Sequence, residues 1–184
     1  MRSRQTNKPD KYIVSECVKV LRDELPYNLH IFVNSVEFIA KVIDTLKLAP
    51  EAIKVVCSTS GESRQENQRK LGNAYPIGQP SDPAKKINFY TSTCFEGCDI
   101  FDPDGVTFIV SDGRKAHTLL DISTLFTQIC GRIRDSRYKA QIVHVYSTTK
   151  YSKAVTLDEF VAATQRTLAE AESYAAEINS LSEA

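Results

Sequence analysis

The chain has 184 residues, of which 42% are hydrophobic and 25% are charged, a balance typical of one soluble globular domain. Its 23 Lys and Arg residues are matched by 23 Asp and Glu residues, which excludes a general polycation that coats nucleic acid. No apolar run approaches the ~20 residues needed to cross a bilayer, and the N-terminus lacks a signal-peptide core. We therefore expect a cytoplasmic protein without a membrane partner.

The first half of the chain alternates helical and strand patterns. A helix is predicted over residues 10–25, because apolar side chains share one face and Pro26 then ends it. A strand at 30–34 leads into a second helix, which begins at Asn34 or Ser35, carries Glu37 for a capping box and ends near Pro50. A second strand follows at 53–58, and then a short helix at 63–71.

The second half continues the alternation after a loop at residues 72–85, which holds three prolines and two glycines. Strands are predicted at 86–91, 106–111 and 141–146, and a helix at 121–134. From residue 156 onward, Thr156 and Glu159 form a capping box before a long amphipathic pattern that would reach ~40 Å as one helix. The expected division is an N-terminal helix in 1–27, a domain in 28–150 and the C-terminal helix in 151–184.

Strands that alternate with helices at this spacing predict a parallel sheet of about five or six strands with helices on both faces, an α/β three-layer sandwich. Ligands of such folds bind beyond the carboxyl ends of the strands. The five cysteines (Cys17, Cys57, Cys94, Cys98 and Cys130) contain no CxxC pair, so we expect no metal site and a reducing compartment. The three histidines, His30, His117 and His144, need no catalytic role.

Three strand-end segments carry a resemblance to a known family. They are HIFVNS at residues 30–35, TSTCFEGCDI at 91–100 and QICGRIR at 128–134. In this order they resemble motifs IV, V and VI of the second RecA-like lobe of superfamily 2 helicases, of the DEAD/DEAH type. The match covers residues 28–147 and implies a RecA-like fold. The GRIR form is similar to phage and viral replication or origin-binding helicases, which favours DNA over RNA as the partner.

Motif VI implies catalytic residues. By resemblance Arg132 is an arginine finger that neutralises charge on a transferred phosphoryl group, and Gln128 couples the nucleotide to the strand. The family places a further Arg where this chain has Asp135, so Arg134 or Arg137 is expected to replace it. The other interpretation of this segment is a solvated basic helix end. Together with motif V, the resemblance assigns contacts with ATP to Gly97, Asp99, Gly131 and Arg137.

The strand ends also imply contacts with a nucleic-acid backbone. The Thr91 hydroxyl and the free N–H groups of a helix beginning at Asn34 suit phosphate, while a looser resemblance adds the segment after the second strand. Local turns and helix caps explain the same residues without a ligand. The expected nucleic-acid-binding residues are Asn34, Ser35, Ser58, Thr59, Thr91 and Ser92.

No glycine in the chain is followed by lysine, so the phosphate loop that grips ATP in this family is missing. The resemblance therefore implies that ATP and Mg²⁺ are held mainly by a first RecA-like lobe, in the same protein or in a separate chain, and that the isolated chain is inactive. The expected function is the second motor lobe of an ATP-dependent helicase; a restriction or remodelling motor shares this lobe. The alternative is a non-catalytic doubly wound module that binds a nucleotide or a protein.

Overall fold

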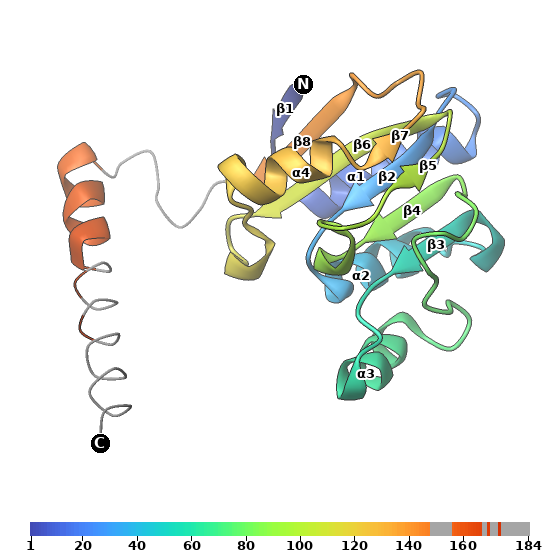
Figure 1. Ribbon diagram of the computed structural model, residues 1–184, viewed down its shortest axis with the longest axis horizontal. Helices are drawn as coiled ribbons and strands as arrows, with labels where there is room; N and C mark the ends of the chain where they lie inside the picture. The colour runs from blue at the N-terminus through green and yellow to red at the C-terminus, as the bar shows by residue number, and fades with distance from the viewer. Residues whose placement is uncertain (148–155, 167–168, 170–172, 174–184) are drawn as a thin grey trace. The chain divides into compact units, whose positions relative to one another are not determined.

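The computed structural model describes residues 1–147, 156–166, 169 and 173 (Figure 1). Residues 1–148 form one compact unit and residues 149–184 form a second, and each is described by itself. No helix among the described residues is long and apolar enough to cross a membrane.

The first unit is built on a six-stranded, all-parallel sheet in the order β1-β8-β6-β2-β4-β3. Its strands are β1 (Arg2–Gln5), β2 (Asn28–Phe32), β3 (Ile53–Val56), β4 (Ile87–Tyr90), β6 (Gly105–Asp112) and β8 (Ile142–Ser147). This arrangement confirms the predicted α/β fold with a central parallel sheet. Five of the strands lie where runs of β-branched and aromatic residues predict them. The exposed and polar β1, which pairs with β8, was not predicted.

Helices cover both faces of this sheet (Figure 1). α1 (Pro9–Leu21) and α2 (Val36–Leu46) pack on one face and α4 (Thr127–Cys130) packs on the other, while α3 (Gly61–Leu71) packs against α2. Short turns of other helix types are η1 (Pro50–Ala52), η2 (Ser92–Cys94), η3 (Ala116–Thr118) and the π-helical η4 (Ile122–Phe126). The first two helices end earlier than predicted, because left-handed residues stop them: Asp23 with φ 55° after α1, and Lys47 with φ 47° after α2.

The side chains of β2 show how the two hydrophobic cores form. Leu29 and Ile31 point to the face that packs against α1 and α2, where Ile13 and Ile39 are fully buried. Phe32 points to the opposite face, in a cluster that includes residues of α4 and of the segment after β4. A strand buried on both faces reads as a continuous apolar run, which is why the sequence predicts a parallel sheet.

The segment predicted as one helix over 121–134 is divided in the structure. The helix ends at Cys130, and the next residues form β7 (Ile133–Arg134), which pairs in parallel with β5 (Ile100–Phe101) on the α4 side of the sheet (Figure 1). Ile133 is 5% exposed, and the extended backbone is what brings its side chain into the protein beside Gly105. The prediction of a helix to residue 134 was therefore wrong.

In the second unit, residues 157–166 are helical, as are 169 and 173. The predicted capping box is confirmed, since the Thr156 amide donates to Glu159 Oε2 at 2.8 Å and the Glu159 amide donates to Thr156 Oγ1 at 3.3 Å. The described helix is short compared with the long helix expected for 151–184. The rest of that expected range lies outside the described residues.

Candidate functional site

A shallow cavity of about 200 Å³ lies at the carboxyl ends of β2, β3 and β4. Strand ends and the residues that follow them contribute most of its lining, which is the edge where ligands of parallel sheets bind. Five of the six residues predicted to contact nucleic acid line it, and Thr59 does not. The lining residues are Asn34, Ser35, Val36, Glu37, Ser58, Asn67, Lys70, Thr91, Ser92 and His117. We call this cavity the strand-end hollow.

The Asn34 side chain joins two walls of the strand-end hollow. Its Nδ2 donates to the carbonyl oxygen of His117 at 2.9 Å, and its Oδ1 accepts from the Ser92 amide at 3.3 Å. The helix cap that was predicted at Asn34 or Ser35 belongs to Ser35, whose Oγ accepts from the Phe38 amide at 3.3 Å. Asn34 is therefore released from capping and instead fixes the loop after β4.

Lys70 brings an ammonium group to the strand-end hollow, and the sequence did not single it out. The Lys70 ammonium lies 2.7 Å from carboxylate oxygens of both Glu37 and Glu66. The hydrogen bond from Lys70 lowers the pKa of Glu37 to about 2, so this carboxylate is charged at neutral pH. Asn67 also lines the hollow and lies three residues before Lys70 in α3, on the same helix face. The three-residue spacing of Asn67 and Lys70 was the feature of the sequence that could have predicted their place in the hollow.

The segments that resemble motifs V and VI meet through the β5–β7 pair. Arg134 Nε lies 2.9 Å from Asp99 Oδ1, with the two side chains 49% and 48% exposed. Arg132 Nη1 donates to the carbonyl oxygen of Cys98 at 3.0 Å, and its Nε donates to that of Gln128 at 3.0 Å. The structure thus brings four of the predicted residues together: Gln128, Arg132, Arg134 and Asp99. Within the described residues, two of the five guanidinium N–H groups of Arg132 are engaged, which leaves three for a ligand.

The two glycines that were assigned to the ATP site differ in their backbone. Gly97 has φ 70°, a left-handed conformation that favours glycine. Gly131 has φ −98°, and a Cβ atom there would meet only the Gln128 carbonyl oxygen at 3.7 Å, an ordinary contact. The backbone therefore favours glycine at position 97 and shows no such preference at position 131.

Arg137 is not brought together with these residues. Its Nη2 lies 2.8 Å from Asp104 Oδ1, and its amide donates to the carbonyl oxygen of Pro103 at 3.0 Å. Asp104 directly precedes β6, so this ion pair lies toward the amino ends of the strands. The strand-end hollow lies at their carboxyl ends.

A buried polar network holds the segment that carries Asp99. His30 Nε2 lies 2.8 Å from Asp102 Oδ2, and His30 Nδ1 lies 3.0 Å from the Tyr90 hydroxyl. Asp102 also accepts from Asn28 Nδ2 at 3.0 Å. Burial lowers the pKa of His30, so the ring is neutral at pH 7. Because a carboxylate only accepts, Nε2 carries the proton and Tyr90 donates to Nδ1.

The pKa of Asp102 is also lowered, because the hydrogen bonds from His30 and Asn28 outweigh the opposing effect of burial. Among the described residues, no group of three or more His, Cys, Asp or Glu side chains is placed to hold a metal ion. The contacts of His30 with Asp102 and Tyr90 join β2 to β4 and to the segment before β6.

No protein-family model matches the chain, and no curated protein matches it. Among solved structures, the chain is similar to the C-terminal domain of the DEAD-box protein Dbp5, with a TM-score of 0.41 and 13% sequence identity. That similarity covers 82% of this chain and 75% of the Dbp5 chain.

Proposed function

We propose that this chain is the second RecA-like lobe of an ATP-dependent nucleic-acid helicase or translocase. The observation that supports this function best is the parallel pairing of β5 with β7. It sets Arg134 beside Asp99 and Arg132 beside Cys98, although these residues are more than 30 positions apart in the sequence. The order of the three motif-like segments and this contact between two of them favour a nucleotide-facing surface over a generic basic helix end.

In this function ATP and Mg²⁺ are held mainly by a first RecA-like lobe. Arg132 and Arg134 of this chain would face the phosphates, with Gln128 and Asp99 positioning them. The three N–H groups of Arg132 that have no partner among the described residues fit this role, because a planar guanidinium binds phosphate oxygens in pairs. When such a finger reaches the transferred phosphoryl group, it contributes roughly 10³–10⁵ in kcat.

The strand-end hollow would bind the backbone of a single nucleic-acid strand, with DNA favoured. Hydroxyls of Ser58 and Thr91 and the Lys70 ammonium supply donors of the kind that phosphate takes. Because these groups contact the backbone, little sequence preference is expected. A phosphate bound here must compete with Glu37 for Lys70, so binding by this lobe alone should be weak and dependent on salt.

Binding of single-stranded DNA to the chain tests the hollow. Lys70→Met should weaken binding and reduce the slope of log K against log salt by about 0.7, the value for one phosphate contact on a single strand. Lys139→Met is the matched control, because Lys139 is exposed near the amino ends of the strands. Fluorescence anisotropy across a salt series measures both. Equal slopes for Lys70→Met and the unchanged chain would remove the hollow from the proposal.

Hydrolysis tests the arginine role. The chain alone should show no ATPase activity. When it acts with a first lobe that carries a phosphate loop, Arg132→Ala should lower kcat by orders of magnitude while KM for ATP stays similar. Arg22→Ala is the control, since Arg22 is exposed after α1. A normal kcat in Arg132→Ala would favour the non-catalytic module instead.

A further inference from the structure

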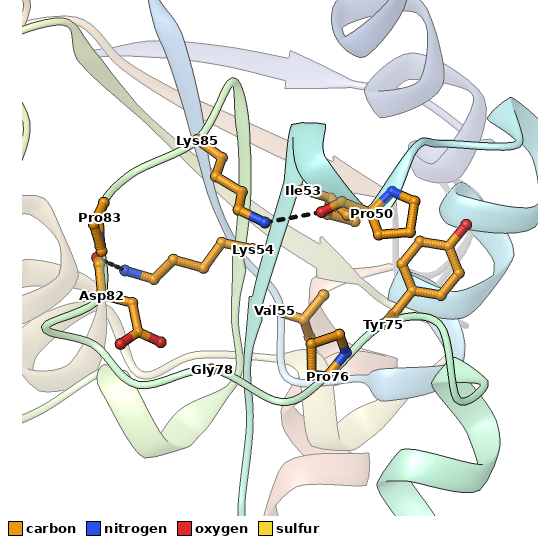
Figure 2. Close-up of a pocket in the computed structure, with 10 residues that line it drawn as sticks. All are labelled: Pro50, Ile53, Lys54, Val55, Tyr75, Pro76, Gly78, Asp82, Pro83 and Lys85. Carbon is orange, nitrogen blue, oxygen red and sulfur yellow. Dashed lines mark hydrogen bonds between the residues drawn. The ribbon is translucent and has the colours of Figure 1, made fainter.

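A second cavity, of about 220 Å³, lies at the outer edge of the sheet (Figure 2). It forms between the edge strand β3 and the loop that precedes β4. The loop is attached to β3 by a bridge between Val55 and Ile77 and by the Gly78 amide, which donates to the Val55 carbonyl oxygen at 2.8 Å. The lining is mostly apolar and comprises Pro50, Ile53, Lys54, Val55, Tyr75, Pro76, Gly78, Asp82, Pro83 and Lys85. We call it the edge cavity.

Lys54 is an unusual member of this lining, because it is only 5% exposed. Its ammonium donates to the carbonyl oxygens of Pro80 at 3.0 Å and Asp82 at 2.5 Å, and it lies 5.9 Å from the centre of the Tyr90 ring. In the described part of the chain it forms no ion pair with a carboxylate. Burial lowers its pKa, against the opposing charge of Asp82. The carbonyl hydrogen bonds hold Lys54 in place but do not neutralise its charge, so a bound anion would stabilise this buried ammonium.

Lys85 brings a second ammonium group to the edge cavity. Its Nζ donates to the carbonyl oxygen of Pro50 at 2.8 Å. Figure 2 shows Lys54 reaching toward Asp82 and Lys85 reaching toward Pro50. Lys85 also forms no ion pair among the described residues. An ammonium has three donors, so among the contacts that the structure describes Lys54 keeps one donor and Lys85 keeps two for a ligand.

We propose that the edge cavity binds a small organic carboxylate whose body is a single ring or a short branched chain. The two carboxylate oxygens take the remaining donors of Lys54 and Lys85, and the body packs against Ile53, Val55 and Tyr75. An apolar cavity of about 150 Å³ already holds benzene, so the size of this one suits a one-ring acid. The two lysines select for negative charge, and the apolar side chains favour an organic anion over an inorganic one. The Asp82 carboxylate also lines the cavity, but one of its oxygens, Oδ2, accepts from the Gln79 amide at 2.7 Å.

This site is separate from the strand-end hollow. Ile53 begins β3, and Pro50 and Lys85 precede β3 and β4, so the edge cavity opens toward the amino ends of these strands. Ser58 of the strand-end hollow follows the carboxyl end of β3. Carboxylate binding therefore needs neither ATP nor nucleic acid, and it can be tested whether or not the motor function holds.

Benzoate is the probe for this site, with the chain of 184 residues as the receptor. Chemical shifts or calorimetry should show saturable binding with Kd on the order of 1 mM, as small ligands allow. Benzyl alcohol has the same ring without the charge, and acetate has the charge without the ring. Each should bind at least about 10-fold more weakly, the loss expected when one of two contacts is removed. Equal binding of benzyl alcohol, or tighter binding of inorganic phosphate, would overturn the proposal.

Variants then locate the bound probe. Lys85→Met and Lys54→Met should each weaken benzoate binding about 10-fold or more while leaving benzyl alcohol unchanged. Lys86→Met is the matched control, because Lys86 is adjacent in sequence but pairs with Asp23 outside the cavity. If Lys54→Met does not fold, Lys85→Met and Lys86→Met still decide the question. An equal loss of benzoate affinity in Lys85→Met and Lys86→Met would show that the lysines act only through general charge, and it would refute the site.

Discussion

Removal of the Tyr90 hydroxyl offers a direct test of the buried network. The hydroxyl lies 3.0 Å from His30 Nδ1, and both side chains are fully buried. Tyr90→Phe keeps the ring, so the stacking with Phe32, with ring centres 4.9 Å apart, is preserved and no cavity forms. The substitution leaves a buried imidazole nitrogen without a donor. A buried polar atom that loses its partner costs about 1–3 kcal/mol, and we expect the free energy of unfolding to fall by that amount.

The loss is measured by denaturant unfolding followed by circular dichroism. For a unit of this size each kcal/mol corresponds to about 2–4 °C in Tm, so a decrease of several degrees is expected. Tyr138→Phe is the control, because among the described residues the Tyr138 hydroxyl makes a single long contact, 3.4 Å to the Pro26 carbonyl oxygen. It should change stability by less than about 0.5 kcal/mol. If Tyr90→Phe proves as stable as the unchanged chain, the hydroxyl does not support His30 and the assigned tautomer is wrong.

Three further predictions concern the backbone at two glycines and the pKa values of His30 and Asp112. Gly97→Ala should destabilise the protein by about 1 kcal/mol through its left-handed backbone, while Gly131→Ala should leave unfolding nearly unchanged, and an equal cost in both would contradict the backbone assignment. The pKa of His30 in the folded protein lies below its ordinary value of 6.5, so below pH 6.5 the unfolded chain takes up a proton more readily than the folded one. The free energy of unfolding should therefore fall as the pH drops below 6.5, and denaturant unfolding at several pH values measures this. Hydrogen bonds from Arg114 hold the pKa of Asp112 at about 2. A further decrease in the free energy of unfolding should therefore appear between about pH 4 and 2, and it should be absent in Asp112→Asn.

The parallel sheet could be predicted because its central strands are continuous apolar runs. A segment that forms a strand only because a neighbouring strand is available to pair with it has no such signal in its sequence. β1 is RSRQ, four polar and exposed residues that become a strand only because β8 offers an open edge. β5 and β7 have two residues each, too few for any period to appear.

The sequence predicted which residues lie at the candidate site better than it predicted which residues contact one another there. Strand-end polar residues from β2, β3 and β4 were expected at one edge, because parallel strands end together. The capping role of Ser35 freed Asn34, and only the structure shows its bonds to His117 and Ser92. The His30–Asp102 contact spans 72 positions, and no local pattern in a sequence encodes a pairing of that range.

These contacts attach one segment to one strand at two points. Residues 92–104 run from the carboxyl ends of the strands back to their amino ends, since they join β4 to β6 in a parallel sheet. Near the start of the segment, Asn34 holds the Ser92 amide; near its end, His30 holds Asp102. Both partners belong to β2 or follow it directly, so Asp99 lies between two fixed points on a single buried strand. A movement of residues 92–104 at the strand-end hollow is therefore opposed both by the Asn34–Ser92 hydrogen bond and by the buried contact between His30 and Asp102. We therefore expect a substitution of His30 to alter the geometry of Asp99 and Arg134, although within the described residues His30 forms a hydrogen bond with neither.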